Sequence, residues 1–197
     1  MYDDRIYCCA CTFMDTIFVI GGSKKYTSSK SCLQFNTKEN SWKEVARMEE
    51  ARSDSACAVF EERIVVSGGY DNDFNDLYTV ESYHVAADSW SPMPSMIQRR
   101  RCHSLVVVKN KLFVIGGLRT IGSCDVFESI SNKFVPLKCP YLFCSNKALS
   151  IRSKIFIFQN NESFVVIYDV CENKWSDELC EATTNLYSYS CVELPIY

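Results

Sequence analysis

The sequence has 197 residues, of which 47% are hydrophobic, 13% aromatic and 23% charged. This composition indicates a globular chain long enough to bury a substantial core, and it excludes a disordered one. The formal net charge of -3 gives no overall field that would attract nucleic acid or a membrane, so we expect neither as a partner. The sequence has no apolar run near the roughly 18 residues of a membrane helix and no signal-peptide layout at its start, so we expect a cytoplasmic protein.

Twelve cysteines are the unusual feature of the composition. In a protein without an export signal they are read most simply as reduced thiols that pack as small apolar side chains. Cys8, Cys9 and Cys11 contain a C-x-x-C spacing, but no second such pair follows and the only histidines are His84 and His103. We therefore expect no metal and no other cofactor, with redox chemistry of the thiols as the alternative.

The first predicted unit covers residues 5–47 and consists of four short strands. An inner strand is predicted at 9–13, and a second strand, TIFVI, ends abruptly on Gly21 and Gly22, where the chain must turn tightly at positive φ. A third strand carries Phe35, and a fourth begins at Trp42 after a turn at Asn40. Arg5 lies sixteen positions before Gly21.

The same markers return in units predicted at residues 52–95 and 100–138. The first glycines of the pairs are separated by 47 and then 48 residues, and an arginine again lies sixteen positions before each. Inner strands are predicted at 56–60 and 104–108. The repeated markers are Arg52, Gly68, Gly69 and Trp90 in the second unit, and Arg100, Gly116, Gly117 and Phe134 in the third. Such a period indicates a repeat architecture.

A fourth unit, predicted at residues 143–180, is degenerate. Gln159 and Asn160 stand where the glycines should be, but Tyr168 and Trp175 keep the seven-residue spacing of the earlier pairs Phe35–Trp42, Tyr83–Trp90 and Phe127–Phe134. The segment NLYSYSCVEL at 185–194 then predicts one extra inner strand. Helical spacing of apolar residues is nowhere sustained, so we expect an all-β chain.

Units of about 45–50 residues with four strands, a double glycine and paired aromatics resemble blades of kelch-type β-propellers. The segments VIGG…CLQFNTKENSW, VSGG…VESYHVAADSWSPMPSM and VIGG…CDVFESISNKF carry this resemblance, which covers nearly the whole chain. We expect one propeller domain over residues 1–197, with four four-stranded blades plus the extra C-terminal strand. Because blade one already has four strands, that extra strand has no incomplete blade to complete. We therefore expect an incomplete ring, the C-terminal part of a larger propeller.

The resemblance to kelch-like proteins implies a noncatalytic domain that binds a protein substrate or peptide. In that family the propeller holds substrates for a cullin-RING ubiquitin ligase, which separate upstream BTB and BACK domains engage. Binding to actin or other cytoskeletal proteins, also known among kelch proteins, is the alternative. Kelch-type copper radical oxidases are a remote alternative, because they use a Tyr/His constellation with a cross-linked cysteine, whereas His84 and His103 fall at unrelated points of the repeat.

The resemblance also places recognition at the rim formed by the loops after the glycine pairs and before the inner strands. The loop at 23–31 is basic, and the loop at 70–78 is acidic with aromatic residues. The candidate partner-binding residues are Lys24, Lys25, Tyr26, Tyr70, Asp71, Asp73, Phe74, Arg99, Arg101, His103 and Arg119.

Several of these candidates have a second interpretation. Arg99 and Arg101 contact an acidic peptide or merely belong to a solvated loop, whereas Arg100 occupies the arginine position of the repeat and is interpreted as structural. Phe74 anchors a partner or tucks under its own loop. His103 contacts a partner or is a satisfied structural histidine. The second aromatics of the pairs, such as Trp42, are expected to pack within the blades.

Overall fold

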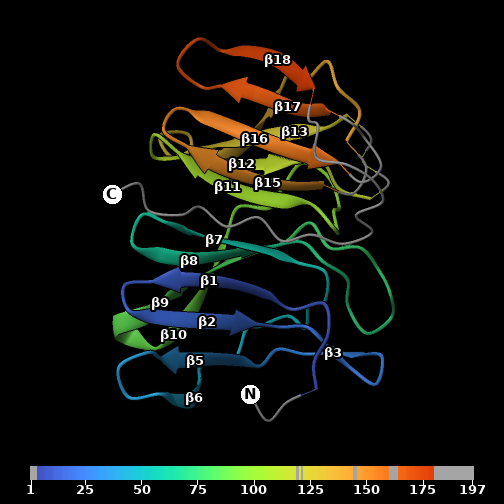
Figure 1. Ribbon diagram of the computed structural model, residues 1–197. Helices are drawn as coiled ribbons and strands as arrows, with labels where there is room; N and C mark the ends of the chain where they lie inside the picture. Colours follow the sequence, from blue (N-terminus) through green and yellow to red (C-terminus); the bar gives the residue numbers. More distant parts are fainter. Residues whose placement is uncertain (1–3, 119, 121, 144–145, 160–163, 180–197) are drawn as a thin grey trace.

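The structure is a computed structural model that describes residues 4–118, 120, 122–143, 146–159 and 164–179. It contains four antiparallel sheets of four strands each, arranged as consecutive blades (Figure 1). The predicted extra strand at 185–194 lies outside the described residues.

Each blade uses its strands in chain order, from an inner to an outer strand. Blade 1 comprises β1 (Cys9–Phe13), β2 (Thr16–Ile20), β5 (Cys32–Asn36) and β6 (Ser41–Val45), with a small hairpin of β3 (Ser23–Lys24) and β4 (Thr27–Ser28) after its glycines. Blade 2 comprises β7 (Ala56–Phe60), β8 (Arg63–Ser67), β9 (Val80–His84) and β10 (Ser89–Met93), with the 3-10 turn Val85–Ala87. Blade 3 comprises β11 (Ser104–Val108), β12 (Lys111–Ile115), β13 (Cys124–Glu128) and β14 (Lys133–Leu137). Blade 4 comprises β15 (Asn146–Ile151), β16 (Lys154–Gln159), β17 (Phe164–Asp169) and β18 (Lys174–Leu179).

The inner strands hold the blades side by side. β1 contacts β7, β7 contacts β11, and β11 contacts β15. The inner strands predicted at 9–13, 56–60 and 104–108 are confirmed at those bounds. The pattern of these strands, apolar and rich in small or β-branched residues, predicts burial. This prediction is wrong for β1, whose residues are exposed or half-buried, holds only at the two ends of β7, and is confirmed for β11, which is almost entirely buried. β1 contacts one inner strand among the described residues, whereas β7 and β11 each contact two, which explains the exposure of β1 but not the difference between β7 and β11.

The seven-residue aromatic spacing is the register of the outer hairpins. Phe35 pairs with Trp42 across β5 and β6, and the Tyr83–Trp90, Phe127–Phe134 and Tyr168–Trp175 pairs repeat this in blades 2, 3 and 4. The ring centroids of the four pairs lie 4.6–5.1 Å apart. The predicted turns before the second aromatics are also confirmed, since Asn40, Asp88, Asn132 and Asn173 all have φ values of 45–52°. Asn and Asp tolerate this left-handed backbone best among residues with a side chain.

Apolar cores fill the spaces between blades. Phe18 and Ile20 of blade 1 pack against Ile64, Val66 and Tyr83 of blade 2, and similar clusters join blades 2 and 3 and blades 3 and 4. Polar bonds support this packing. The Nε1 atom of Trp90 donates to the carbonyl oxygen of Ala46 in the segment after blade 1, at 2.9 Å.

Trp42 departs from the expected blade packing, because 37% of the residue is exposed. Its counterparts are better covered: Phe134 is buried, while Trp90 and Trp175 are half-buried. Each of the two tryptophans donates a hydrogen bond to a carbonyl oxygen in the segment after the preceding blade. For Trp175 the acceptor is the carbonyl oxygen of Lys138, at 2.9 Å from Nε1. Trp42 belongs to blade 1, which no other blade precedes within the described residues, so it contacts only its own blade on that face.

The glycine pairs join a blade to the segment that leads into the next blade. In blade 2, the backbone N–H of Gly69 donates to the carbonyl oxygen of Arg100 at 2.8 Å. Gly68 has a φ of 57°, and a Cβ atom at this position would overlap that same carbonyl oxygen. Any side chain at Gly68 would therefore be strained and would also push blade 3 away.

Candidate binding rim

The topology brings all the loops that follow the glycine pairs to one end of the blades. The loops between second and third strands and the segments before the inner strands share this end, whereas the turns within hairpins such as β1–β2 and β13–β14 lie at the other. We call the first end the glycine rim. In Figure 1 the β3 hairpin marks it in blade 1.

The basic loop at 23–31 contains the β3–β4 hairpin, which presents Lys25 and Tyr26 at its tip. Both residues have positive φ, the backbone of a type I′ hairpin turn. Tyr26 is 82% exposed, and Lys24 and Lys25 are also exposed. The backbone N–H of Ser28 donates to Oδ1 of Asn72 at 2.7 Å, so this hairpin lies against the acidic loop of blade 2.

The acidic loop at 70–78 is built around Asp71. Its Oδ1 atom accepts from the backbone N–H groups of Asp73 and Asn75, both at 2.9 Å, which folds the loop over itself. Phe74 is 58% exposed and stacks on the ring of Tyr70 with centroids 5.7 Å apart. This stacking leaves one side of Phe74 open to solvent.

Tyr70 does not lie where it was expected. It is only 7% exposed, so the expectation of an exposed loop aromatic is wrong. The cause is an antiparallel bridge to Ser53, in the segment before β7, together with the stacked ring of Phe74. The guanidinium of Arg101 also lies over the Tyr70 ring, 5.5 Å from its centre. Tyr70 is therefore a buried residue on which the exposed Phe74 packs, and not itself an exposed anchor.

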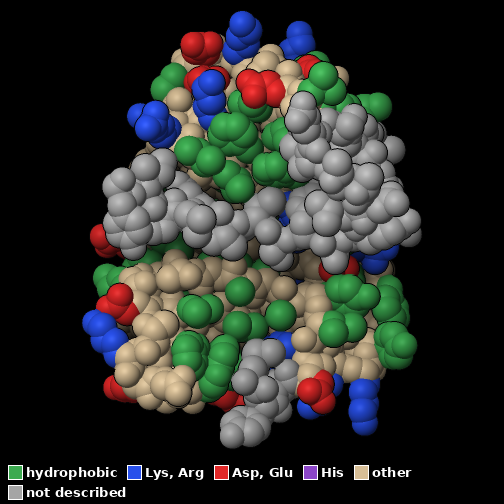
Figure 2. All heavy atoms as spheres, viewed as in Figure 1, with side chains coloured by type: hydrophobic (Ala, Val, Ile, Leu, Met, Phe, Trp, Pro, Cys, Tyr) green, Lys and Arg blue, Asp and Glu red, His purple; other side chains and the backbone are tan. Residues whose placement is uncertain are grey.

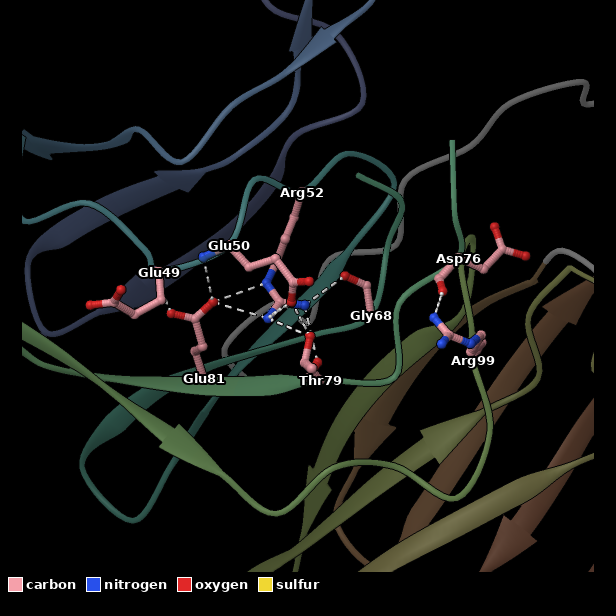
Figure 3. A network of polar contacts seen from close by, with 8 residues as sticks. All are labelled: Glu49, Glu50, Arg52, Gly68, Asp76, Thr79, Glu81 and Arg99. Atoms are coloured by element: carbon pink, nitrogen blue, oxygen red, sulfur yellow. Dashed lines mark hydrogen bonds and ion pairs between the residues drawn. The ribbon is translucent and has the colours of Figure 1, made fainter. Parts of the chain in front are cut away.

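Arg99 and Arg101 bind the acidic loop of their own chain. A guanidinium N–H of Arg99 donates to the carbonyl oxygen of Asp76 at 2.7 Å (Figure 3). The charged group of Arg99 also lies 4.9 Å from the centre of the Tyr78 ring. Arg101 forms an ion pair with Asp76, with 3.2 Å between Nε and Oδ1. Arg101 is thus paired with a carboxylate of its own chain, whereas Arg99 is exposed and bonds only a backbone carbonyl oxygen.

Arg100, between them, has a different environment. It is fully buried, donates to the carbonyl oxygens of Gly116 and Ser123, and pairs with Asp125 at 2.8 Å. Arg52 repeats this arrangement in blade 2: it donates to Gly68 and Thr79 and pairs with Glu81 at 3.0 Å, as Figure 3 shows. Arg5 likewise donates to Gly21 and Ser31 in blade 1. The repeat arginines thus fasten the glycine turns from within.

His103 is buried, 4% exposed, so its side chain is not available to a partner. Its Nε2 atom lies 2.8 Å from Oγ of Ser67, and its Nδ1 atom has no hydrogen-bond partner among the described residues. Burial, reinforced by the charge of Arg100, lowers the pKa of His103 to about 3. The ring is therefore neutral at physiological pH. It belongs to what we call the framework, namely the strands of the blades with their glycine turns and the buried side chains that hold them.

Exposed hydrophobic side chains concentrate at the glycine rim. Most of the large ones that the described residues expose lie there, namely Ile6, Tyr7, Tyr26, Phe74, Tyr78, Ile97 and Leu142. In the half of the molecule that holds blades 1 and 2, Figure 2 shows a group of hydrophobic side chains on the side of the β3 hairpin. All of these except Tyr26 and Phe74 were missed from the sequence, although Tyr78 ends the same loop as Phe74. Aromatic residues on a protein surface are typical of interaction sites.

Arg119 lies outside the described residues. Within the described ranges, no group of three or more His, Cys, Asp or Glu side chains could hold a metal ion. No helix in the described part of the chain is long and apolar enough to cross a membrane.

The blades, the glycine turns and the repeated arginines define a kelch-repeat propeller. The model of the Kelch motif matches residues 4–49, 51–97 and 99–137, and the chain belongs to this family. The fourth blade, which lacks the glycines, lies beyond the matched segments but has the same four-stranded topology.

Individual relatives support this assignment. The chain is 26% identical to Beta-scruin of Limulus polyphemus over 178 residues, 80% of this chain and 19% of the relative. It is 33% identical to Kelch-like protein 40 of Mus musculus over 125 residues, which cover 62% of this chain and 19% of that protein. The chain therefore spans about a fifth of the length of these relatives. The solved structure titled "Structure of YjhT" has the same fold, with a TM-score of 0.80 and 13% sequence identity. The superposition covers 93% of this chain and 68% of the YjhT chain.

Proposed function

We propose that the glycine rim of blades 1 and 2 binds a protein partner and that the propeller captures substrates for a cullin-RING ubiquitin ligase. The observation that carries the first part is the group of exposed aromatic residues on these loops, above all Tyr26 and Phe74. Aromatic side chains bury a large area at a small cost in side-chain entropy and often dominate binding energy. Kelch-like relatives support the second part, in which BTB and BACK domains on the same polypeptide would engage the ligase.

The structure changes the chemistry expected of the partner. Arg101 is already paired with Asp76 and lies over the Tyr70 ring, whereas Arg99 is exposed beside the Tyr78 ring and keeps its charge. The exposed charges nearby include Lys25, Asp73 and Arg99. An apolar or aromatic segment with charges of both signs at its ends fits this surface better than an acidic peptide.

Affinity capture with the native full-length protein tests both parts. We expect Tyr26→Ala combined with Phe74→Ala to remove a captured partner while cullin stays bound. Matched controls exist at the opposite end of the blades, where Met14 and Ile130 are exposed on hairpin turns. Met14→Ala combined with Ile130→Ala should leave capture unchanged. Equal losses in both double variants would contradict binding at the glycine rim, and capture of a partner without cullin would contradict the ligase role.

A second candidate function is binding to actin or another cytoskeletal protein. Its support is the similarity to Beta-scruin, because that alignment covers 80% of the chain, whereas the alignment with Kelch-like protein 40 covers 62%. Co-sedimentation with actin filaments separates the two candidates. If this function is right, the native protein should pellet with filaments, and the rim double variant should remain in the supernatant.

A further inference from the structure

Three thiols meet between the inner strands of blades 1 and 2. Cys9 and Cys11 are two residues apart on β1 and therefore share one face of that strand. Cys57 lies on β7, the inner strand of blade 2, which contacts β1. All three residues pack against the same apolar cluster between the two blades, and each is partly exposed.

Packing alone does not require sulfur at these positions. At the next interface, between blades 2 and 3, the corresponding residues are Ala56, Ala58 and Leu105, which fill the same kind of space with hydrocarbon. The three cysteines are thus a feature of one interface and not of the repeat. Ser55 adds a further polar contact there, with 3.5 Å between its Oγ atom and Sγ of Cys9.

We propose that Cys57 forms a disulfide with Cys9 when the protein meets hydrogen peroxide, and that this bond links the inner strands of blades 1 and 2. The linkage joins the inner strands and is independent of the partner that the rim binds.

Cys9 is the thiol that reacts first. Its hydrogen bond with Cys57, the contact with Ser55 and the charge of Arg52 lower the pKa of Cys9, although burial opposes this shift. The contacts with Cys11 and Cys9 raise the pKa of Cys57. The thiolate form is the nucleophile in such reactions, so the asymmetry assigns attack to Cys9 and resolution to Cys57.

The reaction balances with peroxide as the only oxidant. The Cys9 thiolate attacks one peroxide oxygen, the O–O bond breaks, and the departing hydroxide combines with the proton released from Cys9 to form water. Cys9 is then a sulfenic acid. The sulfur of Cys57 attacks the sulfur of Cys9, the S–O bond breaks as the S–S bond forms, and the hydroxide leaves with the Cys57 proton as a second water. The two thiols lose two electrons in total, and the peroxide gains them.

Peptide mass spectrometry after peroxide treatment tests this proposal. Trypsin separates the residues cleanly, since Cys8, Cys9 and Cys11 fall in peptide 6–24 and Cys57 is the only cysteine in peptide 53–63. We expect the two peptides to appear cross-linked after oxidation and separate after reduction. The cross-link should persist in Cys8→Ala and disappear in Cys57→Ala and in the Cys9→Ala, Cys11→Ala double variant.

A stability measurement provides a readout that does not depend on the variants. Oxidation of the wild-type protein should raise Tm by about 5–10 °C, because the cross-link closes a loop of nearly fifty residues in the unfolded chain. Two results would overturn the proposal: a Cys57 thiol that remains fully alkylatable when the exposed Cys171 is oxidised, or a cross-link to peptide 6–24 that survives in the double variant.

Discussion

Arg99, Arg100 and Arg101 are adjacent in the chain, yet they belong to two different regions of the molecule. Arg100 lies in the framework, fully buried and paired with Asp125, whereas Arg99 and Arg101 lie in the rim and hold the acidic loop through Asp76. The framework repeats from blade to blade, as the matching contacts of Arg52 with Gly68 and Glu81 show. The rim contacts occur once. Position relative to the glycine pair, and not residue type, therefore decides what an arginine does here.

Replacing the framework arginine should give the largest effect. Arg100→Met leaves Asp125 buried without its cation and leaves the Gly116 carbonyl without its donor, so we expect a loss of about 3–5 kcal/mol in the free energy of unfolding. Burial already raises the pKa of Asp125 despite Arg100, so the unpaired carboxyl is expected to protonate and limit the loss. Urea unfolding measures the change.

The matched rim variant sharpens this comparison. Arg99→Met removes an exposed hydrogen bond and a contact with Tyr78, and we expect it to cost less than about 1 kcal/mol. A second change tests the cause of the Arg100 effect, since Arg100→Met with Asp125→Leu should regain part of the lost stability. Similar losses in Arg100→Met and Arg99→Met would break the distinction between framework and rim.

Acid should weaken the framework through His103. The unfolded chain binds a proton on this residue below its ordinary pKa of 6.5, while the folded protein stays neutral until about pH 3. Stability contributed by the neutral ring is therefore present above pH 6.5 and falls as the pH drops from 6.5 towards 3. At pH 5 we expect a loss of about 2 kcal/mol relative to pH 7 from this group.

The measurement is urea unfolding at pH 7 and pH 5, compared between the wild-type protein and His103→Gln. The variant keeps a group that can hydrogen-bond to Ser67 but cannot titrate, so its loss between the two pH values should be smaller by this amount. An identical pH dependence in both proteins would show that His103 is protonated equally in the folded and unfolded states.

Two tryptophans compare an interface between blades with a face that no described blade covers. Trp90→Phe removes the hydrogen bond to the Ala46 carbonyl oxygen and should cost about 1 kcal/mol. Trp42→Phe loses only part of an exposed ring and should cost less than half as much. Thermal unfolding of both variants gives the comparison, and a larger loss for Trp42 would show that its face is covered in solution.

The smallest effect on stability should come from the rim aromatics. Phe74→Ala removes the stack on Tyr70 and should cost about 0.5–1 kcal/mol, because most of the ring faces solvent. Urea unfolding checks this value, and partner capture by the same variant reports on binding. A loss above about 2 kcal/mol would place Phe74 in the framework and remove it from the candidate surface.

Much of the framework could be predicted because its signals are local in the sequence. The Phe35–Trp42 spacing is the distance between partners across one hairpin, and the positive φ at Asn40 belongs to the turn between them. The arginine that lies sixteen residues before each glycine pair bonds the carbonyl oxygen of the first glycine within the same blade. Such contacts recur with the period of the repeat, so a single sequence shows them several times.

The rim and the thiol cluster could not be predicted in the same way. Tyr70 is buried by a bridge to Ser53 and by the Phe74 ring, and Arg101 is neutralised by Asp76, a residue 25 positions earlier. Cys57 meets Cys9 only because β7 lies beside β1. The bridge itself recurs in blade 1 between Ile6 and Ser23, but position 23 carries no aromatic ring there. The burial of Tyr70, the ion pair of Arg101 and the thiol cluster therefore have no second copy in the sequence from which they could be read.

The amino-acid sequence by itself thus determined the blades, their strand register and the turns at the glycine pairs, since short-range sterics and hairpin pairing decide these features. Only the tertiary structure decided which rim side chains reach solvent. Exposure at the rim depends on how loops from neighbouring blades cover one another, as Tyr26 and Tyr70 illustrate with 82% and 7% of each residue exposed. That outcome is a property of packing between segments far apart in the chain.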